Sequence, residues 1–127
     1  MARRVSIEIP GLSHGAPIPM GSKIGNLVYS SGISGRDPQT RELPADPDKQ
    51  AEILFQNVKT FMAQAGGTPD DIIRVTVHMR QEHYRDSINK EWIKMFPDAH
   101  SRPARHAMTT ELRGDVLFQV ELVAVLS

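Results

Sequence analysis

The chain contains no cysteine among its 127 residues. Disulfides, thiolate nucleophiles and cysteine-rich zinc sites are therefore all excluded. Net charge is also absent, because 15 Lys and Arg residues balance 15 Asp and Glu residues. No excess positive charge is available for a phosphate backbone or an anionic membrane, so we predict neither nucleic acid nor a membrane as partner.

Long apolar runs are missing as well. Residues 5–10 alternate apolar with polar side chains and form neither a signal peptide nor a membrane span, which favours a cytoplasmic location. The five histidines lack HExxH-like spacing, so no metal site is predicted. The length suits one compact domain over residues 1–127.

The first half of the chain favours short strands followed by a helix. Period-two alternation predicts a strand over residues 6–9, and the Gly25-Asn26 pair predicts a hairpin joining residues 23–24 to 27–31. Residues 33–48 are rich in turn formers and are expected to be a surface connection. A helix then begins near Asp46, a plausible N-cap, and ends at Gly66.

The second half alternates strands with one more helix. Strands are predicted over residues 73–79, 104–110 and 116–126, and a helix whose apolar face includes Tyr84, Ile88 and Trp92 is closed by Pro97. Ile73 is expected to share the buried face of its strand. This order predicts a two-layer α+β domain, with both helices on one face of a mostly antiparallel sheet.

The last predicted strand has two apolar faces. Alternate residues from Val116 to Leu126 form one face, which the two helices can cover. The opposite face is still too apolar to lie in water. Another copy of the chain is the simplest cover, so the sequence predicts a homo-oligomer. That second face comprises Leu117, Gln119, Glu121, Val123 and Val125.

A few polar residues could carry chemistry. Glu121 and Gln119 point the same way among apolar neighbours, where desolvation would favour a proton-shuttling carboxyl group; an ion pair across an interface is the alternative. Arg105 follows Pro103 at the entry to a strand, and its planar fork of donors suits a carboxylate, although most such arginines form structural ion pairs. Asn89 lies at the edge of a buried helix face.

Several segments together resemble the YjgF/RidA family of reactive intermediate deaminases, in order and over nearly the whole chain from His14 onward. They are residues 24–32, residues 37–42, Asn57-Val58, Ala65-Gly66, residues 75–77, Asn89, residues 102–105 and residues 120–125. The resemblance implies a chorismate-mutase-like α+β fold that assembles as a homotrimer, with clefts between subunits.

The resemblance also implies a reaction and its residues. Family deaminases hydrolyse a small enamine or imine to a 2-oxo acid and ammonia, without metal or organic cofactor. Arg105 matches the arginine that holds the substrate carboxylate. Ser31 and Asn89 match further binding positions, and the backbone of Ala107 matches that of a residue that is often cysteine in the family.

Two departures bear on turnover. The family tyrosine is replaced by Ile18, and Gln119 stands where the active-site glutamate is expected, with Glu121 at the second acidic position. A glutamine can orient water but cannot accept its proton. Three functions therefore stay open: a deaminase of altered specificity using Arg105, Gln119 and Glu121, a non-catalytic binder of small 2-oxo acids, and, less favoured by the neutral charge, a ribonuclease.

Overall fold

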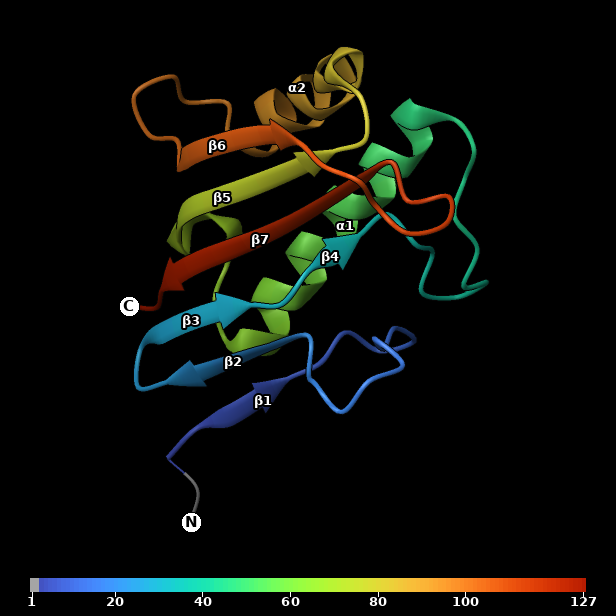
Figure 1. The fold of residues 1–127 in the computed structure, drawn as a ribbon. Coiled ribbons are helices and arrows are strands. Elements are labelled where there is room, and N and C mark those ends of the chain that lie inside the picture. The colour runs from blue at the N-terminus through green and yellow to red at the C-terminus, as the bar shows by residue number, and fades with distance from the viewer. Residues whose placement is uncertain (1–2) are drawn as a thin grey trace.

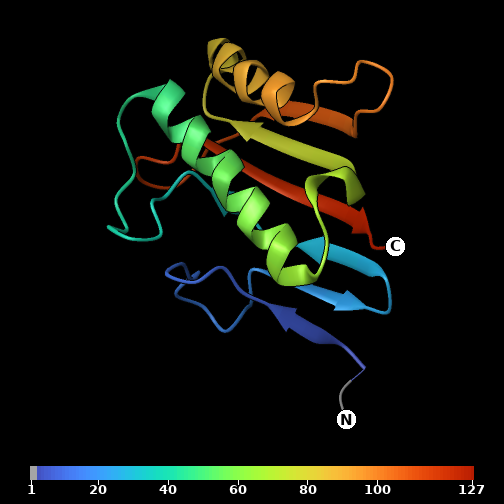
Figure 2. The same cartoon turned by 180° about the vertical axis from the view of Figure 1, so that it is seen from behind.

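A computed structural model describes residues 3–127. A seven-stranded sheet forms one layer and two α-helices form the other, an α+β arrangement of a mixed, mostly antiparallel sheet with both helices on one face (Figures 1 and 2). The sheet order is β1-β2-β3-β7-β5-β6, and β4 also pairs with β7. The strands are β1 (Val5–Ile7), β2 (Gly21–Ile24), β3 (Leu27–Ser30), β4 (Ile33–Ser34), β5 (Ile72–Met79), β6 (Ala104–Thr109) and β7 (Phe118–Val125).

Helix α1 (Pro47–Ala65) has the predicted signals at both ends. The Asp46 side chain accepts a hydrogen bond from the Lys49 amide, and Gly66 ends the helix in the left-handed conformation at φ 94°. The face that packs on the sheet is apolar and includes Leu54, Phe61 and Met62, all fully buried. This helix therefore supplies most of the cover for one side of the sheet.

Helix α2 (Arg85–Met95) connects β5 to β6, which pair in parallel. Ile88 and Trp92 are buried against the sheet. Asp48 links the two helices: Lys90 Nζ lies 2.8 Å from its Oδ2, and Ser87 Oγ donates to its Oδ1 at 2.6 Å. Helix α2 lies near β6, at the border of the sheet (Figure 1).

The two faces of the sheet differ. Phe118, Val120, Leu122 and Ala124 on β7 point toward the helices and are buried, as the alternation predicts. No helix of the described residues covers the opposite face, which faces the viewer in Figure 1 and is called the open face below. Tyr29 (57% exposed), together with Leu27 and Val125, leaves apolar surface there.

Three local predictions were wrong. Residues 33–48 were expected to be a surface connection, but Ile33 is fully buried and pairs with Val120 as part of β4. Ile73 was expected in the core, but a register shift between Ile72 and Arg74 buries Ile72 instead and leaves Ile73 53% exposed. Neither pairing nor bulge has a local sequence signal.

The last strand is also shorter than predicted, beginning at Phe118 rather than Val116. The cause is the fully buried Gln50 of α1. Its Nε2 donates to Asp115 O at 3.3 Å and its Oε1 accepts from Leu117 N at 2.7 Å. The backbone ahead of β7 therefore bonds to a helix side chain.

Across residues 3–127, no helix is long and apolar enough to cross a membrane.

Candidate functional site

Arg105 lies on the edge strand β6, with its side chain on the helix side of the sheet. Its Cα partner on β5 is the buried Val75. The guanidinium carbon lies 4.9 Å from the centroid of the Trp92 ring on α2, a cation–π contact. This contact restrains the guanidinium group, which favours a reproducible direction for its donors.

The electrostatics of Arg105 are those of an anion site. Its Nη1 atom is buried and has no hydrogen-bond partner among residues 3–127. Burial lowers the pKa of the guanidinium, and the nearby positive charge of Arg85 lowers that pKa further. The group still carries its charge at neutral pH. A buried charged donor without a partner is costly, and an incoming carboxylate would relieve that cost.

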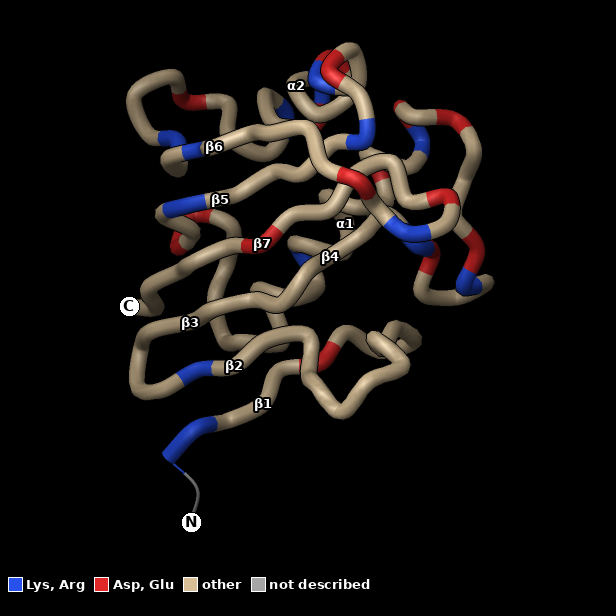
Figure 3. Tube along the Cα trace, viewed as in Figure 1, with Lys and Arg blue, Asp and Glu red and all other residues tan. Residues whose placement is uncertain are grey.

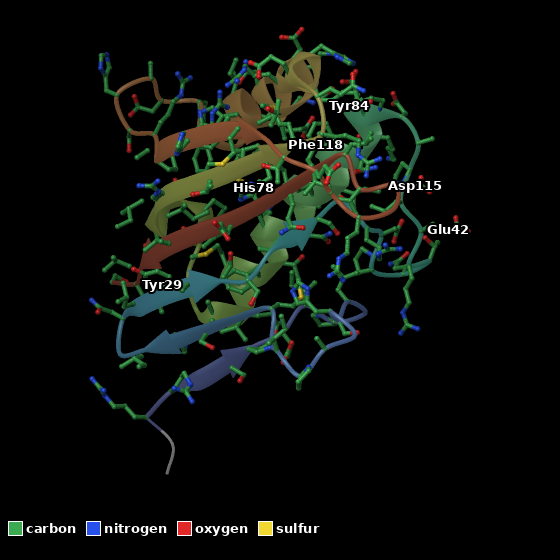
Figure 4. The ribbon with its side chains drawn as sticks, viewed as in Figure 1. Tyr29, Glu42, His78, Tyr84, Asp115 and Phe118 are labelled. Carbon is green, nitrogen blue, oxygen red and sulfur yellow. The ribbon has the colours of Figure 1, made fainter. Side chains whose placement is uncertain are left out.

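Gln119 and Glu121 lie on the other side of the sheet, on β7. Their Cα partners on β5 are His78 and Thr76. Gln119 packs against Gly32: a β-carbon at Gly32 would lie 2.3 Å from Gln119 Nε2. Glu121 is exposed, and its Oε1 lies 3.7 Å from His78 Nε2. Figure 4 shows His78 and Tyr29 among the side chains of this open face.

One chain therefore does not bring its own candidate residues together. Side chains alternate along a strand, so Val75 and Val77 face the helices while Thr76 and His78 face the open side. Arg105 pairs with Val75, whereas Gln119 pairs with His78. The arginine and the glutamine of one chain point away from each other across the sheet.

The other predicted site residues lie in two places, near Arg105 and at the loop that precedes β2. Ala107 follows Arg105 on the same side of β6, and the half-buried Asn89 lies one turn before Trp92 on α2. Ser31 donates from Oγ to Pro19 O at 2.8 Å and from its backbone amide to Met20 O at 2.7 Å. These bonds tie down the loop that presents Ile18, which is 52% exposed.

Three residues near the site, Trp92, Arg85 and His78, carry no local sequence signal of a role in chemistry. Trp92 has the spacing of a core residue, and it is indeed 8% exposed, but its ring also carries the arginine. The distribution of charged residues does not reveal that the open face carries candidate site residues. In Figure 3 the charged residues gather in loops and helices, and the middle strands of the sheet are mostly uncharged.

Comparison with known proteins identifies the family. Residues 17–126 match the family model described as Endoribonuclease L-PSP. The chain belongs to this family, also called YjgF/RidA. A family member from Escherichia coli K12, the putative reactive intermediate deaminase TdcF, is 35% identical over 87% of this chain and 88% of its own. The 2-iminobutanoate/2-iminopropanoate deaminase of the same organism is 31% identical over 86% of this chain and 87% of its own.

Solved structures of family members share the fold. Escherichia coli TdcF with bound serine superimposes with a TM-score of 0.86 at 32% identity, covering 97% of this chain and 99% of that chain. RidA from the Antarctic bacterium Psychrobacter sp. PAMC 21119 gives a TM-score of 0.88 at 26% identity, covering 96% and 99%. The YjgF/RidA assignment, the fold and the relatives named as deaminases thus agree.

Proposed function

We propose that this protein hydrolyses a small carboxylate-bearing imine or enamine to a 2-oxo acid and ammonia. The buried, unpartnered Nη1 of Arg105, held over Trp92, carries this proposal because it suits a substrate carboxylate. The named imine deaminase among the relatives supports the reaction class. The serine bound by the TdcF structure is also a small molecule with a carboxylate.

The proposed sites lie in clefts between subunits of a homotrimer. Arg105 faces the helix side near the sheet edge, and Gln119 and Glu121 occupy the open face, so a site that uses both needs two copies of the chain. The exposed apolar side chains of Leu27, Tyr29 and Val125 make the open face suitable for burial against another subunit.

In the proposed reaction, Arg105 binds the carboxylate and holds the imine carbon for attack by water. Gln119 orients that water, since its amide can accept and donate hydrogen bonds without taking a proton. Asn89, the Ala107 backbone and the Ser31 strand end complete the binding surface. Ile18 gives the cleft an apolar wall, which favours small apolar side chains on the substrate.

A coupled assay tests the reaction. An amino-acid oxidase generates imines in situ from several amino acids, and ammonia release is followed with and without the protein. We expect acceleration over buffer for imines with small apolar side chains, and light scattering should give the mass of a trimer. Equal rates with and without a correctly assembled protein, for every imine, would reject the deaminase.

Substitution of Arg105 by lysine sharpens this test. Lysine keeps the charge but loses the planar fork, so KM should rise about 10-fold, as expected for the loss of one charge-assisted contact. Arg4→Lys is the matched control on an exposed residue. Equal KM values for both variants and the unmodified protein would remove Arg105 from the site.

Gln119 favours a second candidate, a binder that senses 2-oxo acids without turnover, since this residue cannot accept a proton from water. Such a protein would gain thermal stability with a small 2-oxo acid, would lose that gain in Arg105→Ala, and would release no ammonia. Ammonia release above buffer would decide against it.

A further inference from the structure

His78 stands beside the position where the proposed reaction lacks a base. It is the Cα partner of Gln119 in the antiparallel β5–β7 pair, and both side chains lie on the open face. Directly opposed side chains in such a pair have Cβ atoms about 4.5–5.5 Å apart. The side chains of His78 and Gln119 therefore leave the open face side by side.

Two neighbours hold the ring. Nδ1 lies 3.1 Å from Thr110 Oγ1, and Nε2 lies 3.7 Å from Glu121 Oε1. With Nδ1–H donating to Thr110, Nε2 keeps its lone pair. The distance to Glu121 is too long for a hydrogen bond, but at this range the carboxylate stabilises a positive charge on the ring. The arrangement suits a base that becomes charged during the reaction.

Thr110 lines a surface cavity together with Arg80, Thr109, Glu111, Leu112 and Arg113. The Arg80 guanidinium is held by the carbonyl oxygens of Leu112 and Gly114. Glu121 on β7 lies beside the ring, while Arg80, Glu111 and Arg113 line the same cavity as Thr110. The neighbouring residue of β6, Met108, is uncharged.

We propose that His78 is the proton acceptor of the deamination, oriented by Thr110 and assisted by Glu121, in place of a carboxylate at Gln119. This inference rests on the proposed function. Water attacks the carbon of the protonated imine, its oxygen forms the new bond, and one of its protons passes to His78 Nε2. The product of this step is a neutral carbinolamine.

The second step returns the proton. The imidazolium donates to the carbinolamine nitrogen, the C–N bond breaks, and ammonia leaves as the oxygen lone pair forms the carbonyl group. The hydroxyl proton is taken by His78 and released to solvent. One water is consumed, one ammonia and one 2-oxo acid are formed, and no oxidant or reductant is needed.

The test compares pH profiles of kcat for imines generated by the oxidase. Loss of a general base lowers kcat by about 100-fold, so we expect that loss in His78→Gln with KM within about twofold. The acid limb of the profile should also disappear, because a neutral imidazole is needed and imidazoles change charge between about pH 5 and 8. His100→Gln, on an exposed loop, is the matched control.

A second variant, Glu121→Gln, tests the same proposal if His78→Gln fails to assemble. Glu121→Gln removes the negative charge beside the ring, so the imidazolium is less stable and the acid limb moves to lower pH. An unmoved limb overturns the role of His78. In a Gln119→Glu background a carboxylate can accept the proton, so His78→Gln should then lower kcat by less than about threefold.

The outcomes separate the two proposals. Ammonia release by the unmodified protein together with an unchanged kcat and acid limb in His78→Gln overturns the histidine and leaves the deaminase standing. Absence of ammonia release from every imine, by a protein that still gains thermal stability from a 2-oxo acid, overturns both. Loss of the acid limb in a His78→Gln protein that still assembles supports His78 as the base.

Discussion

The two faces of the sheet carry different kinds of side chains. On the helix side, Arg105 lies against Trp92 with one guanidinium nitrogen unpartnered among the described residues. On the open side, His78, Gln119 and Glu121 lie near exposed apolar side chains. The first region is suited to bind a carboxylate, and we propose the second for proton transfer and for contact with another subunit. A site made from both needs two copies of the chain.

Disruption of the open face should have the largest effect on assembly and activity. Tyr29→Glu places a carboxylate in the proposed interface, where burying an unpaired charge costs several kcal/mol. We expect a folded monomer without deaminase activity, measured by light scattering, circular dichroism and ammonia release. Val5→Glu, at a 48% exposed residue on the outer strand, is the control. An active Tyr29→Glu monomer would contradict a shared site.

Removing the charge on the helix side should have the next largest effect. Arg105→Met deletes the proposed charge-assisted contact with the substrate carboxylate, so kcat/KM should fall by about 100-fold. The melting temperature should stay level or rise, because a buried donor without a partner no longer needs to be desolvated. A clear loss of stability with normal kinetics would make Arg105 a structural residue.

The stacking partner should have a smaller effect. Trp92→Phe keeps an aromatic ring but weakens the cation–π contact by about 1 kcal/mol, so kcat/KM should fall about fivefold through a higher KM. Thermal denaturation of the same variant reports the packing loss separately. A fall in kcat alone would argue that Trp92 acts on the chemistry rather than on the orientation of Arg105.

The smallest effect is expected at the link between the helices. Hydrogen bonds from Lys90 and then Ser87 lower the pKa of Asp48. A lowered folded-state pKa stabilises the protein above the unfolded value of about 3.9, and this contribution is lost as pH falls through the folded value. Asp48→Asn should therefore lower the melting temperature by roughly 1–2 °C at pH 7 and by less near pH 3. An equal loss at both pH values would indicate that the charge is not responsible.

Local signals were enough for much of the fold. The Asp46 cap and Gly66 end define α1, and the Gly25-Asn26 pair defines the β2–β3 turn as predicted. The β4 pairing and the bulge near Ile73 were missed because both depend on contacts with β7, which is remote in sequence. The start of β7 was misplaced for the same reason, since Gln50 binds the preceding backbone.

Local patterns in the sequence were enough to predict the helices, most strands and the apolar character of both β7 faces, and the family resemblance singled out Arg105. Capping, turn chemistry and side-chain periodicity act over a few residues, so they are visible in a single chain of letters. Three relations became visible only in the folded chain. Arg105 lies against Trp92, His78 lies opposite Gln119, and the two pairs lie on opposite faces of the sheet. Strand register and sheet order set those relations, and both arise from contacts between distant segments.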